Sequence, residues 1–330
     1  MSADVFNIIF IIFGCSFISY CSAPFIRKLG ERFNILDIPN SRKVHTKPIV
    51  RIGGLSIILT FFTSFFLIVL VIGSDALFLE NNFKIIIILL GSFLFFLIGI
   101  HDDIFKSPPL LRLIVQFFIA FLVSFNGIYF PDFSFYLPYL SDIKITLSPL
   151  LSSIFAGIWI VSITNSINWL DGIDGLSSGY CLILTIGLLS IMTTIDNSLG
   201  VIFFSCLGGS ILGFLIRNFK PAYYIMGDCG SNLLGFSLST SSLFFLNQLN
   251  NNVLQIQYLL LIFSLPVFDM CFVIVNRLFK NRNIFQADRT HIHHRLLDLN
   301  FKYEELIFVL YLYSFISISL GIRGLNNYLN

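Results

Sequence analysis

The sequence predicts an all-α integral membrane protein with about ten transmembrane helices, and three observations support this fold class. The chain has 330 residues, of which 56% are hydrophobic and only 12% are charged, whereas a soluble protein carries about 25% charged residues. Its mean hydropathy is +0.87. Ten stretches are apolar over roughly the 20 residues that a helix needs to cross the hydrocarbon core of a bilayer. Lipid is therefore the solvent for most of this chain.

The ten stretches follow one another along the whole chain and leave no room for a separate soluble domain. They are Val5–Ile26, Ile52–Gly73, Phe83–Ile100, Leu110–Phe130, Pro149–Ile167, Leu176–Ile195, Leu199–Ile216, Asn232–Leu246, Tyr258–Leu278 and Leu306–Gly321. The eighth is the weakest because it is rich in Ser and Thr. We expect a single polytopic membrane domain over residues 1–330.

The first stretch is expected to stay in the protein, with the N-terminus outside. No basic residues precede it and no small-residue cleavage site follows it, as a secretory signal peptide would require. The positive charges of Arg27 and Lys28 come after it instead, which is typical of a span whose far end is cytoplasmic.

The positions of Lys and Arg predict which loops are cytoplasmic, since these residues mark the inner side of a membrane. All but three of the 20 Lys and Arg residues lie in the odd-numbered loops between the ten spans, the exceptions being Lys84, Lys144 and Arg323. The odd-numbered loops therefore face the cytoplasm and both termini lie outside. This is the topology of a multi-pass protein of the cell (inner or plasma) membrane.

Net charge and cysteines argue against two other classes of function. A net charge of +2 gives no general attraction to nucleic acid. The six cysteines show no paired ligand spacing, so neither a disulfide framework nor a cysteine zinc site is expected.

All five histidines and five acidic residues from three motifs gather on the odd-numbered loops or at their edges. They are His45, His101, His291, His293, His294, Asp102, Asp103, Asp171, Asp174 and Asp228. A passive distribution would have scattered them over both faces of the membrane. Their convergence indicates an active site on the cytoplasmic face.

The pair Asp102–Asp103 ends the third span, where adjacent carboxylates repel each other unless a cation lies between them. An isolated pair of this kind is more often a solvated helix end. Lys106 and Arg112 follow closely, and other acidic sites share this face. These neighbours favour a functional pair.

Amide and carboxylate side chains recur at every third position in the next cytoplasmic segment, as Asn165, Asn168, Asp171 and Asp174. This spacing predicts that they lie along one side of a helical or slightly tightened segment. Their hard oxygen atoms suit Mg²⁺, which usually shares its coordination with substrate phosphates. Asp228, between Gly227 and Gly230, lies at the start of a span, where backbone N–H groups attract anions.

The segment His291-Ile-His293-His294-Arg295 is dense in cationic donors. It allows either a metal site, because His is a common zinc ligand, or a clamp on phosphate oxygens, with Arg295 donating forked hydrogen bonds. The neighbouring sites are rich in oxygen and no cysteine lies near, so the phosphate clamp is favoured. In the ninth span, Asp269 is costly in lipid and Pro266 frees backbone groups, so this span carries either a functional acid or only a broken helix that re-enters the cytoplasmic site.

With these motifs assembled, the sequence closely resembles the polyprenyl-phosphate N-acetylhexosamine-1-phosphate transferase family (glycosyltransferase family 4). The resemblance runs from Arg42 to about Leu297. The matching residues are Lys43, His45, Pro48, Arg51, Gly53, Gly54, Asp102, Asp103, Asn168, Asp171, Asp174, Gly227, Asp228, Ser231, His291, His293, His294 and Arg295. The histidine segment lacks the three consecutive histidines of the branch that uses UDP-MurNAc-pentapeptide, and resembles that of the UDP-GlcNAc branch.

The resemblance implies transfer of N-acetylhexosamine-1-phosphate from a UDP-sugar to polyprenyl (undecaprenyl) phosphate, with release of UMP, as the first membrane step of a cell-envelope glycan. It implies Mg²⁺, or Mn²⁺ in its place, as the cofactor. By analogy with the family, the residues divide as follows. The metal is bound by Asn168 and Asp228, and the nucleotide or the metal is organised by Asp171 and Asp174. The lipid phosphate is held by Arg112 and Lys106 and is deprotonated or positioned by Asp102 or Asp103. The diphosphate is faced by His291, His293, His294 and Arg295, and Lys43 and His45 contribute to substrate binding.

Two alternatives stay open at this point. A secondary transporter also has about ten spans and broken helices, although it would place charged residues in mid-membrane and often show an internal repeat. The same reaction with UDP-GalNAc or UDP-MurNAc-pentapeptide differs by one or two pocket contacts. A homodimer is compatible with the sequence.

Overall fold

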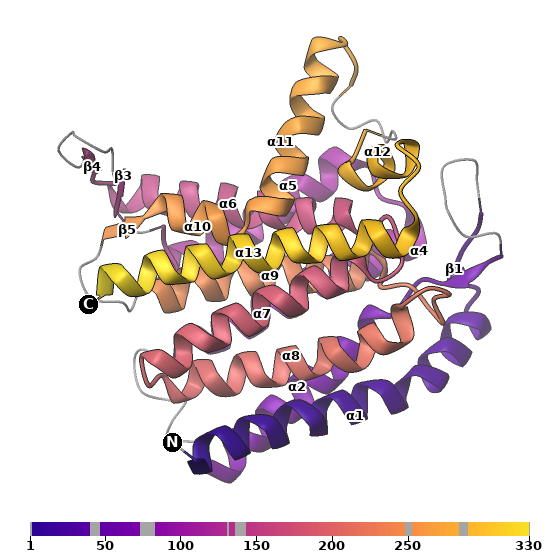
Figure 1. Ribbon diagram of the computed structural model, residues 1–330, viewed down its shortest axis with the longest axis horizontal. Coiled ribbons are helices and arrows are strands. Elements are labelled where there is room, and N and C mark those ends of the chain that lie inside the picture. The colour runs from indigo at the N-terminus through magenta and orange to yellow at the C-terminus, as the bar shows by residue number, and fades with distance from the viewer. Residues whose placement is uncertain are drawn as a thin grey trace.

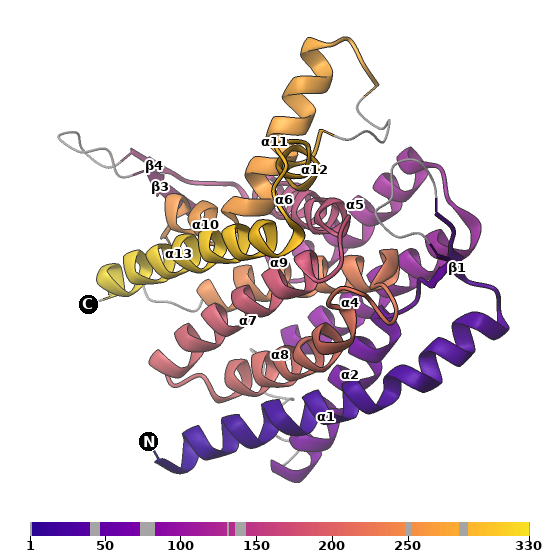
Figure 2. The same cartoon turned by 45° about the vertical axis from the view of Figure 1, so that its right-hand side comes forward.

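The protein folds as a bundle of helices, seen here in a computed structural model that describes residues 2–39, 47–72, 83–130, 132–135, 143–247, 253–283 and 290–329. The long helices run roughly side by side, and one helix, α11, stands out from the bundle in both views (Figures 1 and 2). The helices are α1 (Ser2–Arg32), α2 (Gly54–Ile72), α4 (Phe83–Phe105), α5 (Pro109–Phe125), α6 (Pro149–Leu170), α7 (Leu176–Thr194), α8 (Ser198–Asn218), α9 (Gly227–Leu246), α10 (Ile256–Ile262), α11 (Ser264–Phe279), α12 (Ile292–Asp298) and α13 (Tyr303–Leu329).

Seven of the described helices are long and apolar enough to cross a membrane, namely α1, α2, α4, α6, α7, α8 and α13. The pair α10–α11 forms an eighth candidate, bent by 88° at its break. This confirms the prediction of a helical membrane protein. The predicted fourth and eighth spans fall on α5, which has only 17 residues, and on α9, which does not pass as apolar enough.

The weak signal of α9 has a packing explanation, because this helix lies in the interior of the bundle against α4, α6 and α2. Its serines are buried, and their hydroxyls form hydrogen bonds within α9 or with a neighbouring helix. Ser239 donates to the carbonyl of Gly235 at 2.7 Å, and Ser237 donates to Ser92 Oγ of α4 at 2.8 Å. Polar side chains are tolerated on α9 because its neighbours shield them from lipid.

The predicted break in the ninth span is present between α10 and α11. Pro266 is the third residue of α11, within the first turn, where the missing N–H of a proline breaks no helical hydrogen bond. The bend turns α11 away from the bundle axis (Figure 1).

Two small sheets lie at opposite ends of the bundle (Figure 1). At one end β1 (Leu36–Asp37) pairs with antiparallel β2 (Ile49–Val50), with Leu36 opposite Val50. At the other end the order is β4-β3-β5, and β3 (Asp132–Phe135) runs antiparallel to β4 (Ile143–Ile145) and parallel to β5 (Val253–Gln255). Both chain termini lie at the three-stranded end (Figure 1). The end that carries β1 and α12 holds the polar clusters described next.

Candidate active site

Carboxylates and guanidinium groups from distant parts of the chain meet at the β1 end of the bundle. They are Asp102 and Asp103 at the end of α4, Asp171 after α6, Asp228 at the start of α9, Arg51 after β2, and Arg112 on α5. Four carboxyl groups thus share two guanidinium groups at this site.

Arg51 is the central cation of this group. Its Nε lies 2.7 Å from Asp103 Oδ1, and its Nη2 lies 3.1 Å from Asp228 Oδ1. A longer contact of 3.7 Å joins Nη1 to Asp37 Oδ1. Burial alone would lower the pKa of Arg51, but the charges of Asp228, Asp103 and Asp37 outweigh burial and raise it. The side chain therefore stays charged and ties the β1–β2 strands to α4 and α9.

Arg112 makes the second set of ion pairs. Its Nη1 donates to Asp102 Oδ2 and, at 3.3 Å, to Asp228 Oδ2. The other oxygen of Asp102 accepts the backbone N–H of Ser107 at 2.8 Å. Asp228 therefore receives one ion pair from Arg51 and one from Arg112. Asp228 is thus an anion held between two cations.

Asp103 has a different environment from its neighbour Asp102. Its side chain is fully buried and accepts the backbone N–H groups of Asp228 at 3.0 Å and Cys229 at 2.9 Å. These are unsatisfied donors of the first turn of α9, so Asp103 caps that helix from α4.

Two glycines explain how α9 begins so close to its neighbours. Gly227 has φ +73°, and a Cβ there would lie 2.1 Å from the carbonyl oxygen of Arg51. At Gly99 of α4, a Cβ would lie 2.3 Å from the carbonyl oxygen of Asp228. Only glycine permits both approaches, and together they bring Asp228 against the acids of α4.

Asn168 of α6 completes the contacts of Asp228. Its amide nitrogen lies 2.8 Å from Asp228 Oδ1 and 2.8 Å from Ser231 Oγ. The oxygen and nitrogen of an amide are exchangeable by a flip, so the same side chain presents an oxygen beside Asp228 when a cation is there. The described residues contain no group of three or more His, Cys, Asp or Glu side chains arranged to hold a metal ion. The donor set fits Mg²⁺ held by one or two protein oxygens and completed by phosphates and water.

The prediction that Asn165, Asn168, Asp171 and Asp174 lie along one side of a helix holds only in part, because α6 ends at Leu170. Asn165 and Asn168 lie on the helix, whereas Asp171 caps its C-terminus and Asp174 accepts the N–H of Ala222 at 3.1 Å. Burial raises the pKa of Asp171 well above its ordinary value, and the charge of Asp228 raises it further, against the opposing effect of Arg51.

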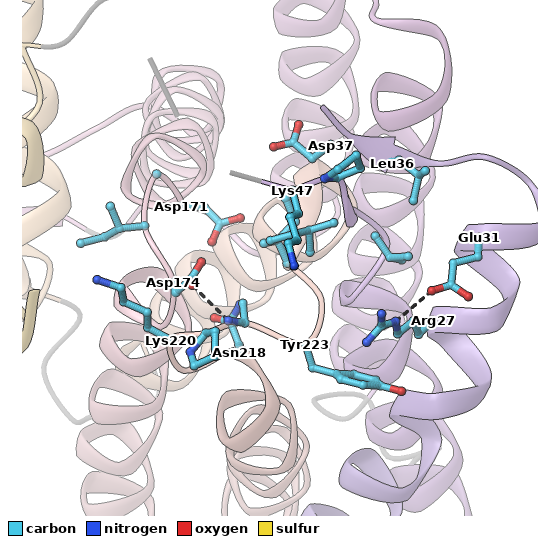
Figure 3. Close-up of a pocket in the computed structure, with 18 of the residues that line it drawn as sticks. Arg27, Glu31, Leu36, Asp37, Lys47, Asp171, Asp174, Asn218, Lys220 and Tyr223 are labelled. Carbon is cyan, nitrogen blue, oxygen red and sulfur yellow. Dashed lines mark hydrogen bonds and ion pairs between the residues drawn. The ribbon is translucent and has the colours of Figure 1, made fainter. Parts of the chain in front are cut away.

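A polar cavity of ≈ 530 Å³ opens beside this turn. Asp171 and Asp174 lie on one side of it and Arg27 and Tyr223 on the other, with Lys47 between them (Figure 3). Further lining residues are Asp37, Asn218, Lys220 and Tyr303. Its volume is in the range of cavities that hold small-molecule ligands.

The histidine segment forms the N-terminus of α12 and docks on α11 and the α6–α7 turn. The carboxylate of Asp269 contacts His291 Nδ1 at 2.8 Å and accepts the N–H of Ile292 at 2.7 Å. His293 lies against Gly172, where a Cβ would come within 2.3 Å of His293 Nε2. Burial, and then the neighbouring His294 and His291, lower the pKa of His293 well below its ordinary value. His293 is therefore a neutral imidazole at pH 7.

The structure brings most of the predicted site residues to one end of the bundle. Arg295 is exposed, and its guanidinium lies 4.1 Å from the ring centre of Phe272. Lys106 is exposed just after α4. Lys43 and His45 lie outside the described residues, so their predicted roles are not tested.

Three contributions were missed from the sequence. Arg51 was assigned to the matching motif but not to the site. Gln116, on the turn of α5 that follows Arg112, bonds to both α6 and α9. Asp269 was noted as an acid within a span but was given no partner, and it holds His291. A polar side chain within an apolar span is a general signal of function and would have identified Gln116.

The comparison with known proteins agrees with this arrangement. Residues 85–246 match the model of the glycosyl transferase family 4. A probable undecaprenyl-phosphate N-acetylglucosaminyl 1-phosphate transferase of Bacillus subtilis is 31% identical over 294 residues, covering 89% of this chain and 78% of the relative. An undecaprenyl-phosphate alpha-N-acetylglucosaminyl 1-phosphate transferase of Thermotoga maritima is 30% identical over 277 residues, 84% of this chain and 78% of the relative.

A third relative is more distant. The decaprenyl-phosphate N-acetylglucosaminephosphotransferase of Mycobacterium leprae is 28% identical over 314 residues, covering 90% of this chain and 78% of the relative. Because the identity to the Bacillus subtilis relative is 31% over 89% of this chain, the chain belongs to glycosyl transferase family 4, among the polyprenyl-phosphate N-acetylhexosamine-1-phosphate transferases.

Proposed function

We propose that the protein transfers GlcNAc-1-phosphate from UDP-GlcNAc to a polyprenyl phosphate and releases UMP, as the first membrane step of a cell-envelope glycan. The observation that carries this proposal is the position of Arg112. It binds Asp102 and Asp228 and precedes the residues of α5 that line an apolar groove. A phosphate headgroup with a hydrocarbon tail matches that combination of charge and apolar surface.

The acceptor lipid would lie in the groove between α5 and α6. This groove has a volume of ≈ 530 Å³ and is almost wholly apolar, lined by Leu113, Ile114, Phe117, Phe118, Phe121, Ile158, Val161 and Ser162. An isoprenoid chain carries no polar groups that a protein must satisfy, so such a groove suits it. Arg112, and Lys106 near it, would bind the acceptor phosphate at the membrane boundary.

The UDP-sugar would enter the polar cavity beside Asp171 and Asp174. Lys47 and Lys220 on its wall provide positive charge for the diphosphate, and Tyr223 and Tyr303 provide aromatic surface for the nucleotide. The neutral imidazole of His293 borders Gly172 at the same turn. His291, His294 and Arg295 would face the diphosphate from α12, as phosphate ligands rather than metal ligands.

Asn168 and Asp228 would hold Mg²⁺, whose chemistry is to neutralise the diphosphate oxygens as charge moves during transfer. The rest of the charge is supplied by Arg51 and Arg112. The carboxyl groups of Asp102, Asp103, Asp171 and Asp228 outnumber the guanidinium groups of Arg51 and Arg112 at this site, which supports a requirement for an added cation.

The proposed reaction is a direct displacement. An oxygen of the acceptor phosphate attacks the phosphorus that carries GlcNAc, a new P–O bond forms, the P–O bond to the UMP phosphate breaks, and UMP leaves with the electron pair. A phosphate monoester is largely ionised at pH 7, so no strong base is needed, and Asp102 serves to orient the acceptor through Arg112. An aspartyl-phosphate intermediate is unnecessary in this scheme.

In the membrane, α5 and α9 would complete ten spans with both termini outside. The site end carries β1 and α12, while both termini lie at the other end (Figure 1). Arg27, Arg51, Lys106 and Arg112 lie at the site end, which by the rule of positive residues inside is the cytoplasmic face of the cell membrane.

A transfer assay tests the proposal. Purified protein in detergent receives radiolabelled UDP-GlcNAc, undecaprenyl phosphate and Mg²⁺, beside an Asp228→Asn variant and a Ser242→Ala control on the far half of α9. We expect label in the organic phase and UMP in the aqueous phase for wild type and Ser242→Ala, and neither for Asp228→Asn. If no UDP-N-acetylhexosamine transfers label, the transferase proposal fails and transport becomes the leading alternative.

A further inference from the structure

α5 carries Arg112, yet it is held to the bundle by few buried side chains. Its buried residues are Gln116, Ala120, Val123 and Ser124. Large apolar side chains on its other faces are strongly exposed, among them Leu110, Leu111, Ile114, Phe118 and Phe125. Lipid exerts no hydrophobic force that would press such a helix against its neighbours. The position of Arg112 therefore depends on the limited apolar packing of α5 and on its polar contacts with other helices.

Besides the ion pairs of Arg112, Gln116 makes polar contacts from α5 to two neighbouring helices. Its side chain is completely buried. Gln116 Oε1 accepts a hydrogen bond from Asn165 Nδ2 of α6 at 2.8 Å, and Gln116 Nε2 donates to Asn232 Oδ1 of α9 at 3.3 Å. We call Gln116, Asn165 and Asn232 the amide clasp. It ties α5 to both helices that carry the proposed metal ligands.

Each member of the amide clasp lies one helical turn from a member of the proposed active site. Gln116 follows Arg112 by four residues on α5, Asn165 precedes Asn168 by three on α6, and Asn232 follows Asp228 by four on α9. Residues at these spacings share a helix face. The clasp therefore forms a second polar layer beneath the group Arg112–Asp228–Asn168, with matching contacts between the same three helices.

The clasp also borders the apolar groove. Phe117 follows Gln116 directly and lines the groove, as does Val161 of α6. The carbonyl of Val161 accepts a further hydrogen bond from Asn165 Nδ2 at 2.8 Å. The separation of α5 and α6 at the head of the groove is thus set by the same amide that binds Gln116.

We propose that Gln116 is a positioning residue for the acceptor lipid. It fixes the rotation of α5 so that Arg112 meets Asp102 and Asp228, and it sets the width of the groove where the acceptor's first isoprene units enter. This inference rests on the proposed function, since the acceptor is the lipid phosphate. It assigns Gln116 no contact with the donor nucleotide, which occupies the cavity on the other side of Asp171.

The test compares Gln116→Leu with wild type, and measures KM for undecaprenyl phosphate and for UDP-GlcNAc separately. Interhelical hydrogen bonds in membrane proteins contribute roughly three- to twentyfold in an equilibrium. We expect KM for the acceptor to rise by about that factor, with KM for UDP-GlcNAc unchanged. Gln116→Asn keeps the amide but is one methylene shorter, so its KM for the acceptor should lie between those of wild type and Gln116→Leu. This variant also provides the test if Gln116→Leu does not fold.

Ser124→Ala is the matched control, because Ser124 is also buried on α5 and its hydroxyl donates to the carbonyl of Ala120 within its own helix. It should leave both KM values unchanged. A purely structural role for Gln116 would raise both KM values together or lower only the amount of folded enzyme, and either result overturns the inference. Unchanged kinetics in Gln116→Leu also overturns it, while wild-type activity in the same assay keeps the proposed function intact.

Discussion

At the scale of single residues, Asp102 and Asp103 are neighbours in sequence with different surroundings. Asp103 is fully buried, pairs with Arg51 and caps α9. Asp102 pairs with Arg112 beside the proposed acceptor site. The sequence predicted the pair as catalytic, and the contacts divide it into an acid that caps α9 and an acid that pairs with Arg112 beside the proposed acceptor site.

The first prediction follows from this division. Asp103→Ala should lower the free energy of unfolding by about 3 kcal/mol, because it leaves Arg51 partly unpaired and uncaps α9. Asp102→Asn should keep the thermal midpoint close to that of wild type and lose transfer activity. Thermal unfolding in detergent together with transfer rates checks both. Equal losses of stability in the two variants would contradict the division.

A second prediction concerns the metal. Because Asn168 and Asp228 provide the protein oxygens for the proposed Mg²⁺, chelation should abolish transfer and added Mg²⁺ should restore it. Asn168→Leu should raise the Mg²⁺ concentration for half-maximal rate at least about tenfold. A Mg²⁺ titration of both proteins measures this, with Ser166→Ala on the same helix as the control. An unchanged titration curve for Asn168→Leu would show that Asn168 is not a metal ligand.

Among single residues, the sequence identified polar and charged side chains that lie on or next to the loops. It named Asp228 and Asn168, and the structure brings them to 2.8 Å. It left out Arg51 and Gln116 because their importance depends on which helix face meets which neighbour. That rotation follows from packing between α4, α5, α6 and α9, which no single segment contains.

At the scale of elements, α12 depends on α11 for its place. Asp269 binds both the ring of His291 and the first N–H of α12, so one carboxylate orients the ring and starts the helix. Hydropathy correctly indicated a broken ninth span at Pro266, because proline and an acid interrupt an apolar run. It could not show that the break turns the acid toward a segment twenty-two residues later.

The third prediction tests this role of Asp269. Asp269→Asn should lower kcat by about tenfold or more, because the amide holds His291 less firmly in its orientation, an effect of the size seen for groups that orient ligands. His291→Asn should lower kcat as well, and the double variant should be no worse than His291→Asn alone. Transfer rates of the three variants provide the measurement. Additive losses would show that Asp269 acts independently of His291.

At the scale of the whole molecule, the alternation of apolar stretches and basic loops predicted most of the architecture. Seven described helices and one bent pair qualify as spans. α5 and α9 fall short for opposite reasons: α5 is short and faces lipid, while α9 is polar and interior. A hydropathy threshold assumes that a span faces lipid on most sides, and α9 does not.

The fourth prediction tests the topology. A cysteine at Lys106, exposed beside the site, should react with a membrane-impermeant maleimide only after the inner membrane is opened. A cysteine at Asp196, exposed between α7 and α8, should react in intact spheroplasts. The background protein lacks the exposed native Cys21 and Cys271. The reverse labelling pattern would place the site end outside the cell.

The central claim is that the site joins a phospho-sugar to a lipid phosphate, and mass spectrometry of the lipid product tests it most directly. Wild-type protein is incubated with undecaprenyl phosphate, UDP-GlcNAc and Mg²⁺, and the lipid and UMP are quantified in the same sample. We expect a lipid whose mass is increased by one GlcNAc-1-phosphate, and the release of one UMP for each lipid modified. An unmodified lipid, or a lipid that gains GlcNAc with release of UDP, would contradict it.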